Sequence, residues 1–316
     1  MQKFSLLLLL SLLFAACNTV QDQPDSAPLT SKTMAPGHFS GGLYEYWYEG
    51  VAELNTYDLQ QIRYGEIHPG QATLIFVSED FLTDKQVKND NYTNPASTPI
   101  IKTNFLRRFT TGIYDYSVMT SVFTPTKTDE QPHTLKVTTG LQDWCGQTFT
   151  QLNHDGGGAW NVQLRSYFER EGDTNKQLPA DFLEDEVFNR IRTGWENLPT
   201  GNFNVIPNTG YLLMTHQPYE AAKATVRLSD YAGDRFTGTS LKSYVVDFTD
   251  LGRKLEVVFE AASPYVIRGW TESYDSRGKQ LTTVATLTHQ VREPYWSQNS
   301  TADVGRRDSL GLPVYE

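Results

Sequence analysis

Residues 113–123 read IYDYSVMTSVF, and large and polar side chains alternate along them. One face carries the side chains of Tyr114, Tyr116, Val118 and Val122. The opposite face carries Asp115, Ser117 and Ser121. Because successive side chains of a strand point to opposite sides of a sheet, this period of two predicts a β-strand with one buried face.

Segments on both sides of this strand carry further β signals. Residues 72–77, ATLIFV, are apolar on both faces, which predicts a central strand that is covered on both sides. Residues 147–152 and 160–168 flank a glycine-rich tract and predict a hairpin, because glycine supplies the positive φ of a tight turn. Residues 68–71, HPGQ, predict another turn.

The last third of the chain and one helical segment complete the predicted fold. Residues 255–290 hold short alternating segments that predict an antiparallel meander. Residues 179–193 predict a helix, with Pro179 in its first turn and Gly194 closing it. Its apolar face carries Phe182, Leu183, Val187 and Ile191. The expected fold is mainly β: an antiparallel barrel-like or clamshell sheet with this one helix packed on it.

The amino terminus predicts where the protein resides. Lys3 precedes a short leucine-rich run that ends in Ala15, Ala16 and Cys17, as in a secretory signal peptide. The run is shorter than the roughly 20 residues that a membrane-spanning helix needs. Its end resembles the lipobox of bacterial lipoproteins, in which the cysteine is acylated and becomes the first mature residue. This resemblance implies a periplasm-facing outer-membrane lipoprotein anchored by palmitate-type chains on Cys17.

Four regions follow from these signals. Residues 1–16 are the predicted signal peptide, and residues 17–40 are the lipidated cysteine and a flexible tether, because they hold few large apolar residues. Residues 41–291 are the β-rich domain. Residues 292–316 are predicted to form an irregular C-terminal tail, because the alternating pattern ends there.

Charge and cysteine content exclude some functions. The formal charge of the 316-residue chain is −10, which disfavours nucleic acid as a partner because phosphates require a basic surface. It also disfavours electrostatic docking on anionic lipids. The chain has two cysteines, so if Cys17 is acylated, Cys145 has no disulfide partner and the fold must be stable without one.

Several tracts in combination resemble a family of bacterial envelope lipoproteins whose activity is uncharacterised. They are residues 47–54 (WYEGVAEL), 63–66 (RYGE), 111–114 (TGIY), 117–121 (SVMTS) and 144–146 (WCG). Members are often labelled "septum formation inhibitor Maf". Maf nucleotide pyrophosphatases are cytosolic α/β proteins that open with a Ser-rich, Arg-containing loop, which this sequence lacks. The resemblance, which covers most of residues 43–290, therefore implies an envelope lipoprotein and not a nucleotide hydrolase.

Few residues are candidates for catalysis. Cys145 is the weak candidate nucleophile, with His154, His216 or His289 as its base, although a free cysteine is more often a small buried apolar residue. The six histidines lack metal-ligand spacing, so no metal and no cofactor are expected. Residues 169–173, EREGD, offer carboxylates for glycan hydrolysis, but such a tract is more often a solvated turn.

Aromatic residues are the more informative feature, at 12% of the chain. Residues 43–48, LYEYWY, predict a strand because aromatic side chains favour strands. The predicted binding residues on strands are Tyr44, Tyr46, Tyr48, Tyr114, Tyr116 and Trp270. Such side chains can line a groove for a lipid or sugar, although each could equally pack a core.

Three functional hypotheses remain open at this stage. The first is a non-enzymatic binding module for a lipid, a glycan or an envelope protein. The second is a hydrolase that uses Cys145 with a histidine. The third is a structural subunit of an envelope complex.

Overall fold

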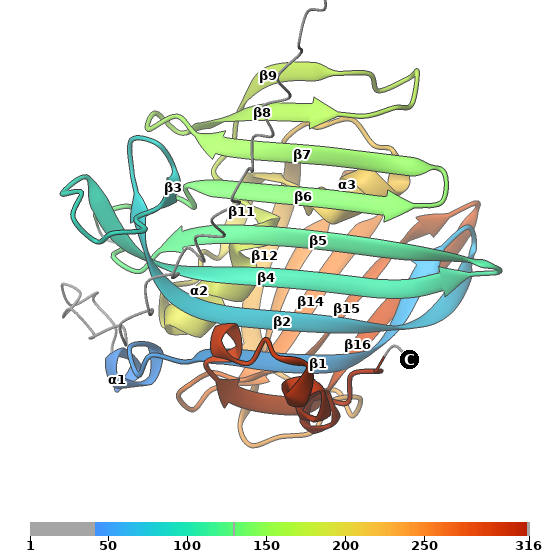
Figure 1. The fold of residues 1–316 in the computed structure, drawn as a ribbon. Coiled ribbons are helices and arrows are strands. Elements are labelled where there is room, and N and C mark those ends of the chain that lie inside the picture. Colours follow the sequence, from blue (N-terminus) through green and yellow to red (C-terminus); the bar gives the residue numbers. More distant parts are fainter. Residues whose placement is uncertain (1–41, 129, 315–316) are drawn as a thin grey trace, which may run out of the picture. The chain divides into compact units, whose positions relative to one another are not determined.

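Sixteen strands form one large sheet in the computed structural model, which describes residues 42–128 and 130–314. Along the main path the strand order is β10-β11-β12-β13-β14-β15-β16-β1-β2-β4-β5-β6-β7-β8-β9, and β3 pairs with β2 (Figure 1). Neighbouring strands pair antiparallel, except for the parallel β10–β11 pair. The prediction of a mainly β, antiparallel fold is confirmed.

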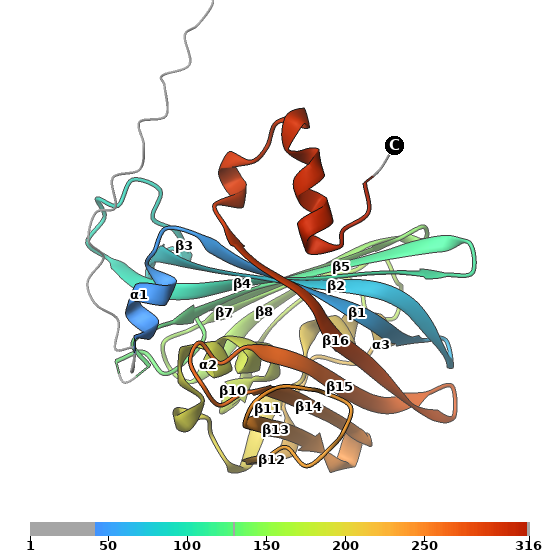
Figure 2. The ribbon, with the colours of Figure 1, turned by 90° about the horizontal axis from the view of Figure 1, so that it is seen from below.

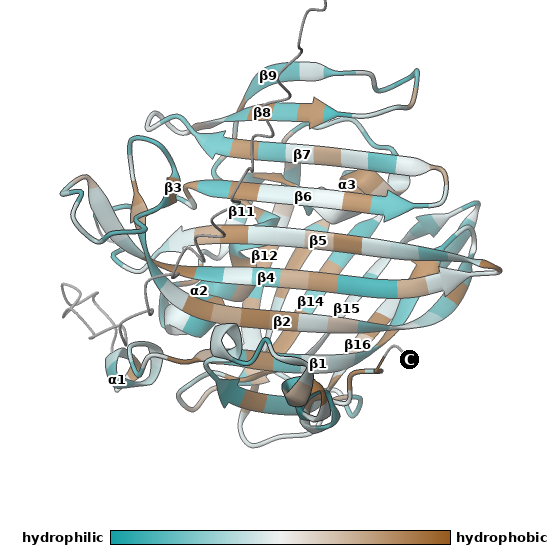
Figure 3. Cartoon of the chain, in the orientation of Figure 1, coloured by the Kyte–Doolittle hydropathy of each residue, from teal (hydrophilic) through white to brown (hydrophobic). Residues whose placement is uncertain are grey.

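The first half of the sheet follows the chain order closely. Its strands are β1 (Ala52–Arg63), β2 (Glu66–Leu82), β3 (Val87–Lys88), β4 (Ser97–Thr111), β5 (Tyr114–Pro125), β6 (Lys136–Asp143), β7 (Gly146–His154), β8 (Ala159–Arg165) and β9 (Thr174–Pro179). The predicted hairpin of residues 147–168 is present as β7 and β8. Figure 3 shows bands of hydrophobic and hydrophilic residues along β5 to β8 and a longer hydrophobic stretch in β2.

The second half contains the predicted meander and the short helices. Its strands are β10 (Phe182–Leu183), β11 (Gly201–Ile206), β12 (Ala222–Asp230), β13 (Leu241–Phe248), β14 (Arg253–Glu260), β15 (Ile267–Ser276) and β16 (Lys279–Glu293). The α-helices are α1 (Leu43–Trp47), α2 (Val187–Gly194) and α3 (Thr209–Thr215). The 3₁₀ segments are η1 (Glu184–Glu186), η2 (Trp195–Asn197), η3 (Thr249–Leu251), η4 (Tyr295–Ser297) and η5 (Thr301–Leu310).

The sheet folds back on itself as an open clamshell. Figure 2 shows one layer that contains β1, β2, β4 and β5 and a second layer that contains β11 to β15, with α2 and α3 between them. The two ends of the sheet, β9 and β10, are joined by residues 180–181 but are not paired with each other. Within this connection, the backbone N–H of Asp181 donates a hydrogen bond of 2.8 Å to the carbonyl oxygen of Asn204 in β11.

Two apolar cores fill the space between the layers. The first core packs α2 between the layers through Val187, Phe188 and Ile191, which contact strand residues including Phe76, Phe105, Val226, Tyr244, Val257 and Trp270. The second core packs α3 through Tyr211, Leu212, Leu213 and Met214 against residues including Tyr116, Val118, Val162 and Tyr274. Burial on both sides of each helix explains why such short helices are stable here.

The alternation of residues 113–123 is confirmed in β5. Tyr116, Val118 and Val122 are buried in the second core, whereas Asp115 and Met119 are exposed. The central position of β2 is also confirmed, because it lies between β1 and β4.

The C-terminal segment covers the outer face of β2. There Ile75 and Val77 pack with Tyr295 and Leu310, and the Gln71 side chain donates a hydrogen bond of 2.9 Å to the Gly311 carbonyl oxygen. The segment predicted to be irregular therefore forms 3₁₀ turns that cover a sheet face.

Three local predictions are wrong or displaced. Residues 43–47 form helix α1 instead of a strand. The turn predicted at residues 68–71 lies inside β2, and the chain reverses at Tyr64 and Gly65 instead. The helix predicted from residue 179 begins later, because Pro179 ends β9 and Phe182–Leu183 pair with β11.

Candidate functional site

A pocket of about 290 Å³ lies at the end of the clamshell where the β8–β9 loop faces the chain that leaves α3. It is lined by Leu164, Arg170, Glu171, Thr174, Lys176, His216, Gln217, Pro218 and Tyr219. Leu164 and Thr174 are partners across β8 and β9, so one wall of the pocket is the last strand pair of the sheet. We name this cavity the His216 pocket.

An imidazole–carboxylate pair stands at the centre of the lining. His216 Nδ1 lies 2.6 Å from Glu171 Oε1, and both side chains are largely buried. The Ser166 hydroxyl donates to Glu171 Oε2 over 2.6 Å. Phe168 packs edge-on against the His216 ring with the ring centroids 4.5 Å apart. These contacts fix the orientation of the imidazole.

The local backbone explains how these two side chains meet. Gly172 has a φ of +57° and closes the turn in which its N–H donates to the Phe168 carbonyl oxygen over 2.9 Å. His216 follows α3 in the left-handed region, with a φ of +56°, and its N–H donates to the Leu212 carbonyl oxygen. Non-glycine residues rarely adopt this conformation, and such residues cluster at functional sites.

The pocket carries an excess of positive charge. Arg170 and Lys176 line it, are exposed and form no ion pair with the residues that the structure describes. Glu171 is the one acid in the lining, and it is already engaged by His216 and Ser166. The pocket therefore offers two unpaired cations in a chain whose formal charge is −10.

The order of these groups does not match a serine hydrolase. In a nucleophile–base–acid arrangement the serine hydroxyl donates to the histidine, and the histidine in turn is oriented by the carboxylate. Here the Ser166 hydroxyl donates to Glu171, which leaves the serine without a base. Glu171 instead joins Ser166 and His216, and its two oxygens hold the hydroxyl and the imidazole in place.

A second pocket, of about 470 Å³, lies over β11 and β12. Its charged lining residues are Lys223, Asp247 and Asp250, so acids outnumber cations there. The Thr225 hydroxyl donates to Asn202 Oδ1 over 2.9 Å in its lining, but the lining residues include no histidine.

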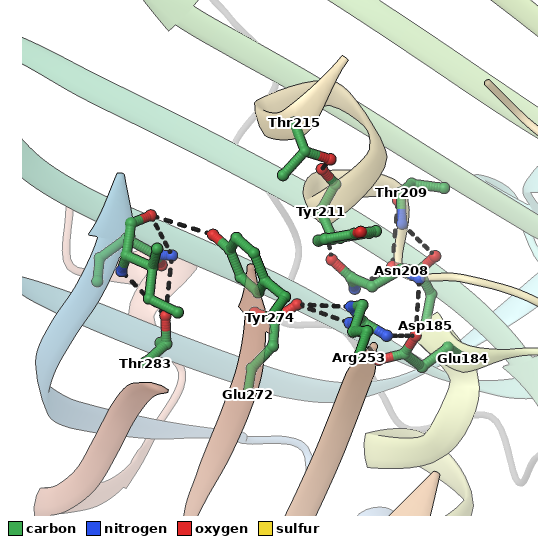
Figure 4. A network of polar contacts seen from close by, with 12 residues as sticks. Glu184, Asp185, Asn208, Thr209, Tyr211, Thr215, Arg253, Glu272, Tyr274 and Thr283 are labelled. Atoms are coloured by element: carbon green, nitrogen blue, oxygen red, sulfur yellow. Dashed lines mark hydrogen bonds and ion pairs between the residues drawn. The ribbon is translucent and has the colours of Figure 1, made fainter. Parts of the chain in front are cut away.

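The interior between the layers holds buried charge networks (Figure 4). Arg253 is fully buried and donates to Glu184 at 2.5 and 2.7 Å and to Glu272 at 2.6 and 3.1 Å. Asp185 accepts hydrogen bonds from Asn208 and from the backbone and hydroxyl of Thr209, between 2.7 and 3.1 Å. These contacts join η1 and α3 to β14 and β15.

Burial sets the protonation of this network. Burial is the main cause that raises the pKa of Asp185 to about 7, and the negative charge of Glu184 raises it further. The hydrogen bonds from Thr209 act in the opposite direction. Desolvation lowers the pKa of Arg107, whose Nη2 lies 3.5 Å from Oδ1 of Asn208. The network is therefore densely charged and shielded from water.

A second buried ion pair joins α2 to β1, next to α1. Arg192 of α2 and Glu53 of β1 have fully buried side chains, and Arg192 Nη2 donates to Glu53 Oε2 over 2.6 Å. Glu53 also accepts hydrogen bonds from the Tyr46 hydroxyl and from Asn55. Because both cores and both ion networks occupy the interior, the inner faces of the sheet are filled.

The predicted aromatic residues lie in different environments. Tyr116 and Trp270 are buried in the second and first cores, with exposed fractions of 1% and 3%. The prediction that Tyr44, Tyr46 and Tyr48 lie on a strand is wrong, because α1 carries the first two and Tyr48 caps it. Burial raises the pKa of Tyr48 to about 12. Tyr114 is half-buried at the start of β5, with its ring 6.3 Å from that of Trp144.

Cys145 lies in the β6–β7 turn and is exposed rather than buried. Partial loss of hydration and the neighbouring Cys145 raise the pKa of the Tyr167 hydroxyl to about 12. Within the described part of the chain, no hydrogen bond joins Cys145 to a histidine. His154 stacks on His133, His216 binds Glu171, and His289 contacts Thr288.

Other predictions concern features that the structure does not bring to this site. Cys17 lies outside the described residues. Among residues 42–128 and 130–314, no group of three or more His, Cys, Asp or Glu side chains could hold a metal ion. No helix in the same ranges is long and apolar enough to cross a bilayer.

Both members of the central pair are candidates in the sequence, but no local pattern connects them. Residues 169–173 predict a solvated turn or a source of carboxylates, and His216 is a candidate base for Cys145. The structure instead brings Glu171 and His216 together across 45 positions. Lys176 and Tyr219 carry no local signal, because only the return of the chain after α3 places them in one lining.

Comparison with known proteins gives little outside information. No family model matches the chain, and no curated protein matches it. Among solved structures, it is similar to a β-barrel-like protein of a domain of unknown function, DUF1849, from Brucella abortus. The TM-score is 0.47 at 10% sequence identity, and the match covers 77% of this chain and 98% of that chain.

Proposed function

We propose that this protein is a non-enzymatic binding module of the bacterial envelope, and that its ligand is a small anionic group held in the His216 pocket. The observation that carries the proposal is the pair of cations Arg170 and Lys176, which form no ion pair within residues 42–128 and 130–314 and lie beside an oriented imidazole. We further propose that Cys17 anchors the module to the outer membrane on its periplasmic side.

The chemistry of the lining selects a phosphate or a carboxylate. An arginine binds such groups through two parallel hydrogen bonds, and a lysine adds a point charge. His216 adds a ring nitrogen, Nε2, because Nδ1 is engaged by Glu171. Leu164 and Pro218 supply apolar surface for the uncharged part of the ligand.

The size of the pocket limits the ligand to one headgroup or one sugar. Pockets for drug-sized ligands measure about 300–1,000 Å³, and this pocket lies at the lower limit of that range. A glycerophosphoryl headgroup and a uronic acid both fit this description. Both are chemically suited to a lipid or glycan ligand of the envelope.

The double substitution Arg170→Gln and Lys176→Gln is expected to weaken binding of the anion at least about 10-fold, because each lost charged contact contributes roughly 1.5 kcal/mol or more. Isothermal titration calorimetry would compare inorganic phosphate, glycerophosphoethanolamine and galacturonate. Preference for the second compound identifies a lipid headgroup, and preference for the third identifies an acidic glycan.

The matched control removes the same charge elsewhere. Lys85 and Lys254 are exposed and lie outside the pocket lining, so Lys85→Gln with Lys254→Gln should leave the affinity unchanged. The proposal fails if the wild-type protein binds none of the three anions. It also fails if the control variant loses as much affinity as the pocket variant.

The anchor is tested separately from the pocket. Substituting Cys17→Ala is expected to abolish labelling by radioactive palmitate, because the variant lacks the residue that would be acylated. The protein should then move from the membrane fraction to the soluble periplasmic fraction, because the acyl chains supply the anchoring. Cys145→Ala is the control and should keep both properties. Labelling that persists in Cys17→Ala would disprove the anchor.

A further inference from the structure

The most exposed large apolar side chains of the described residues lie at one end of the sheet. Ile113 is 82% exposed, Trp144 is 70% exposed and Tyr167 is 50% exposed. Each belongs to a different connection: the β4–β5 turn, the β6–β7 turn and the β8–β9 loop. We name these three residues the tip row.

The strand order makes these connections neighbours. Strands β4 to β8 are consecutive in the sheet and antiparallel, so every second connection lies at the same end. Figures 1 and 2 both show the β4–β5 turn at the end opposite α1. Adjacent strands are about 4.8 Å apart, so neighbouring hairpin turns are separated by about 10 Å.

Side-chain contacts extend the row between the tips. The rings of Tyr114 and Trp144 lie 6.3 Å apart. The Tyr167 ring lies against Gly146, where an added Cβ would come within 2.7 Å of it. Trp144 and Tyr167 therefore each rest against a neighbouring connection, although both side chains remain exposed to solvent.

Packing in a buried core does not account for these residues. Neither core nor either satellite cluster of buried apolar residues includes a member of the tip row. At the other end, the β7–β8 turn carries Gly156, Gly157 and Gly158, which is the usual composition of an exposed turn. The β2–β4 connection at that end does carry Val87 and Tyr92, but they are 43% and 37% exposed, less than any member of the tip row. The three most exposed apolar side chains therefore gather at the opposite end, which points to a binding role for that end.

We propose that the tip row inserts into the interface of a lipid bilayer. Separate apolar side chains on protruding turns suit penetration between lipid headgroups better than they suit a flat protein surface. Tryptophan and tyrosine favour this interface because they combine an apolar body with a polar tip. Isoleucine at the most exposed tip supplies the purely apolar contact.

The charge of the chain specifies the kind of bilayer. The formal charge of the chain is −10, so we expect insertion to be driven by apolar burial and not by attraction of the whole protein to anionic headgroups. The partner is therefore a zwitterionic lipid surface. This inference is independent of the ligand of the His216 pocket.

The length of the tether permits this orientation. The 24 residues between Cys17 and Gly42 span at most about 80 Å when extended. Strand β4 has 15 residues and is about 50 Å long. Chain that enters at α1 can therefore run past the length of the sheet while the opposite end contacts the membrane.

The test uses residues 41–316, which contain both cores, with vesicles of phosphatidylcholine that carry brominated acyl chains. Bromine quenches tryptophan fluorescence on contact, so wild-type protein should show quenching through Trp144. The triple variant Ile113→Ser, Trp144→Ser and Tyr167→Ser is expected to bind at least about 10-fold more weakly in a flotation assay.

A matched control alters three similar side chains elsewhere. Trp296, Val304 and Val314 are 42%, 46% and 43% exposed and lie in the C-terminal segment. Their joint substitution by serine should leave vesicle binding unchanged. Equal losses in both triple variants would overturn the proposal, as would a wild-type protein that does not bind.

Two further outcomes distinguish the bilayer from other partners. Adding phosphatidylglycerol to the vesicles should weaken binding, and stronger binding would show electrostatic docking instead. Analytical ultracentrifugation without lipid should show a monomer. Self-association that the tip-row variant abolishes would identify a second copy as the occupant and would refute insertion.

Discussion

Replacing Arg253 with methionine is expected to destabilise the protein by more than about 5 kcal/mol, which approaches the whole stability of a typical domain. Arg253 is the shared counter-charge of two carboxylates, and it donates to Glu184 and to Glu272. The side chains of these acids are 1% and 6% exposed. Removing the guanidinium therefore leaves two buried negative charges without a hydrogen-bonded counter-charge.

The surroundings cannot replace the lost charge. Asp185 already has a pKa of about 7 because it is buried next to Glu184. Arg107, the other buried cation nearby, is not hydrogen-bonded to Glu184 or Glu272 in the described structure. Water cannot solvate the acids without opening the contact between α3 and the sheet.

Urea denaturation followed by tryptophan fluorescence measures the effect. The control is Arg227→Met, because Arg227 forms an exposed 3.2 Å ion pair with Asp247, and such pairs contribute about 0–1 kcal/mol. If Arg253→Met does not fold, the combination of Arg253→Met with Glu184→Gln and Glu272→Gln should restore part of the stability. A loss no larger than the control's would contradict this view of the network.

Patterns with a short period were predicted well from sequence. The alternation in β5, the two apolar faces of β2 and the β7–β8 hairpin depend on neighbouring residues and on the pleat of a strand. The satellite core of Ile75 and Val77 with the C-terminal segment supplies the physical reason for an apolar outer face.

Predictions from amino-acid composition were wrong where tertiary packing overrides the local conformational preference. The aromatics of residues 43–47 favour strands, but Leu43 and Trp47 lie one helical turn apart and both are buried. That spacing of four was the available signal. At Gly70, the missing side chain serves a close approach of strands, because an added Cβ would lie 2.4 Å from the Arg108 carbonyl oxygen.

Most contacts of the candidate site could not be predicted from the sequence. Glu171 and His216 meet across 45 positions, and Glu53 and Arg192 meet across 139. Pairings of this kind depend on how the sheet folds over, and no local pattern encodes them. The tip row could not be predicted from sequence either. An apolar residue in one turn indicates a binding surface only when neighbouring turns also carry apolar residues, and this requires the strand order.

The second large effect is expected at the Glu53–Arg192 pair. Arg192→Met should cost about 3–5 kcal/mol, because it leaves Glu53 charged and buried. Burial by itself raises the pKa of Glu53, but the Arg192 guanidinium and the hydrogen bonds from Tyr46 and Asn55 together outweigh burial and hold that pKa below its ordinary value. The stability from the pair is therefore present above the unfolded pKa of about 4.3 and is lost as the pH falls through the folded pKa.

A double-mutant cycle separates the pair from its surroundings. The variant Glu53→Met with Arg192→Met should be more stable than Arg192→Met alone, because methionines can pack against Trp47 and Phe76, over whose rings the guanidinium now lies at 5.0 Å. Full recovery is not expected, since the Tyr46 hydroxyl and the Asn55 amide both lose their acceptor, at about 1 kcal/mol each. A double variant as unstable as the sum of the two single variants would show that the charges do not interact, and the clamshell would then be held at this end by packing alone.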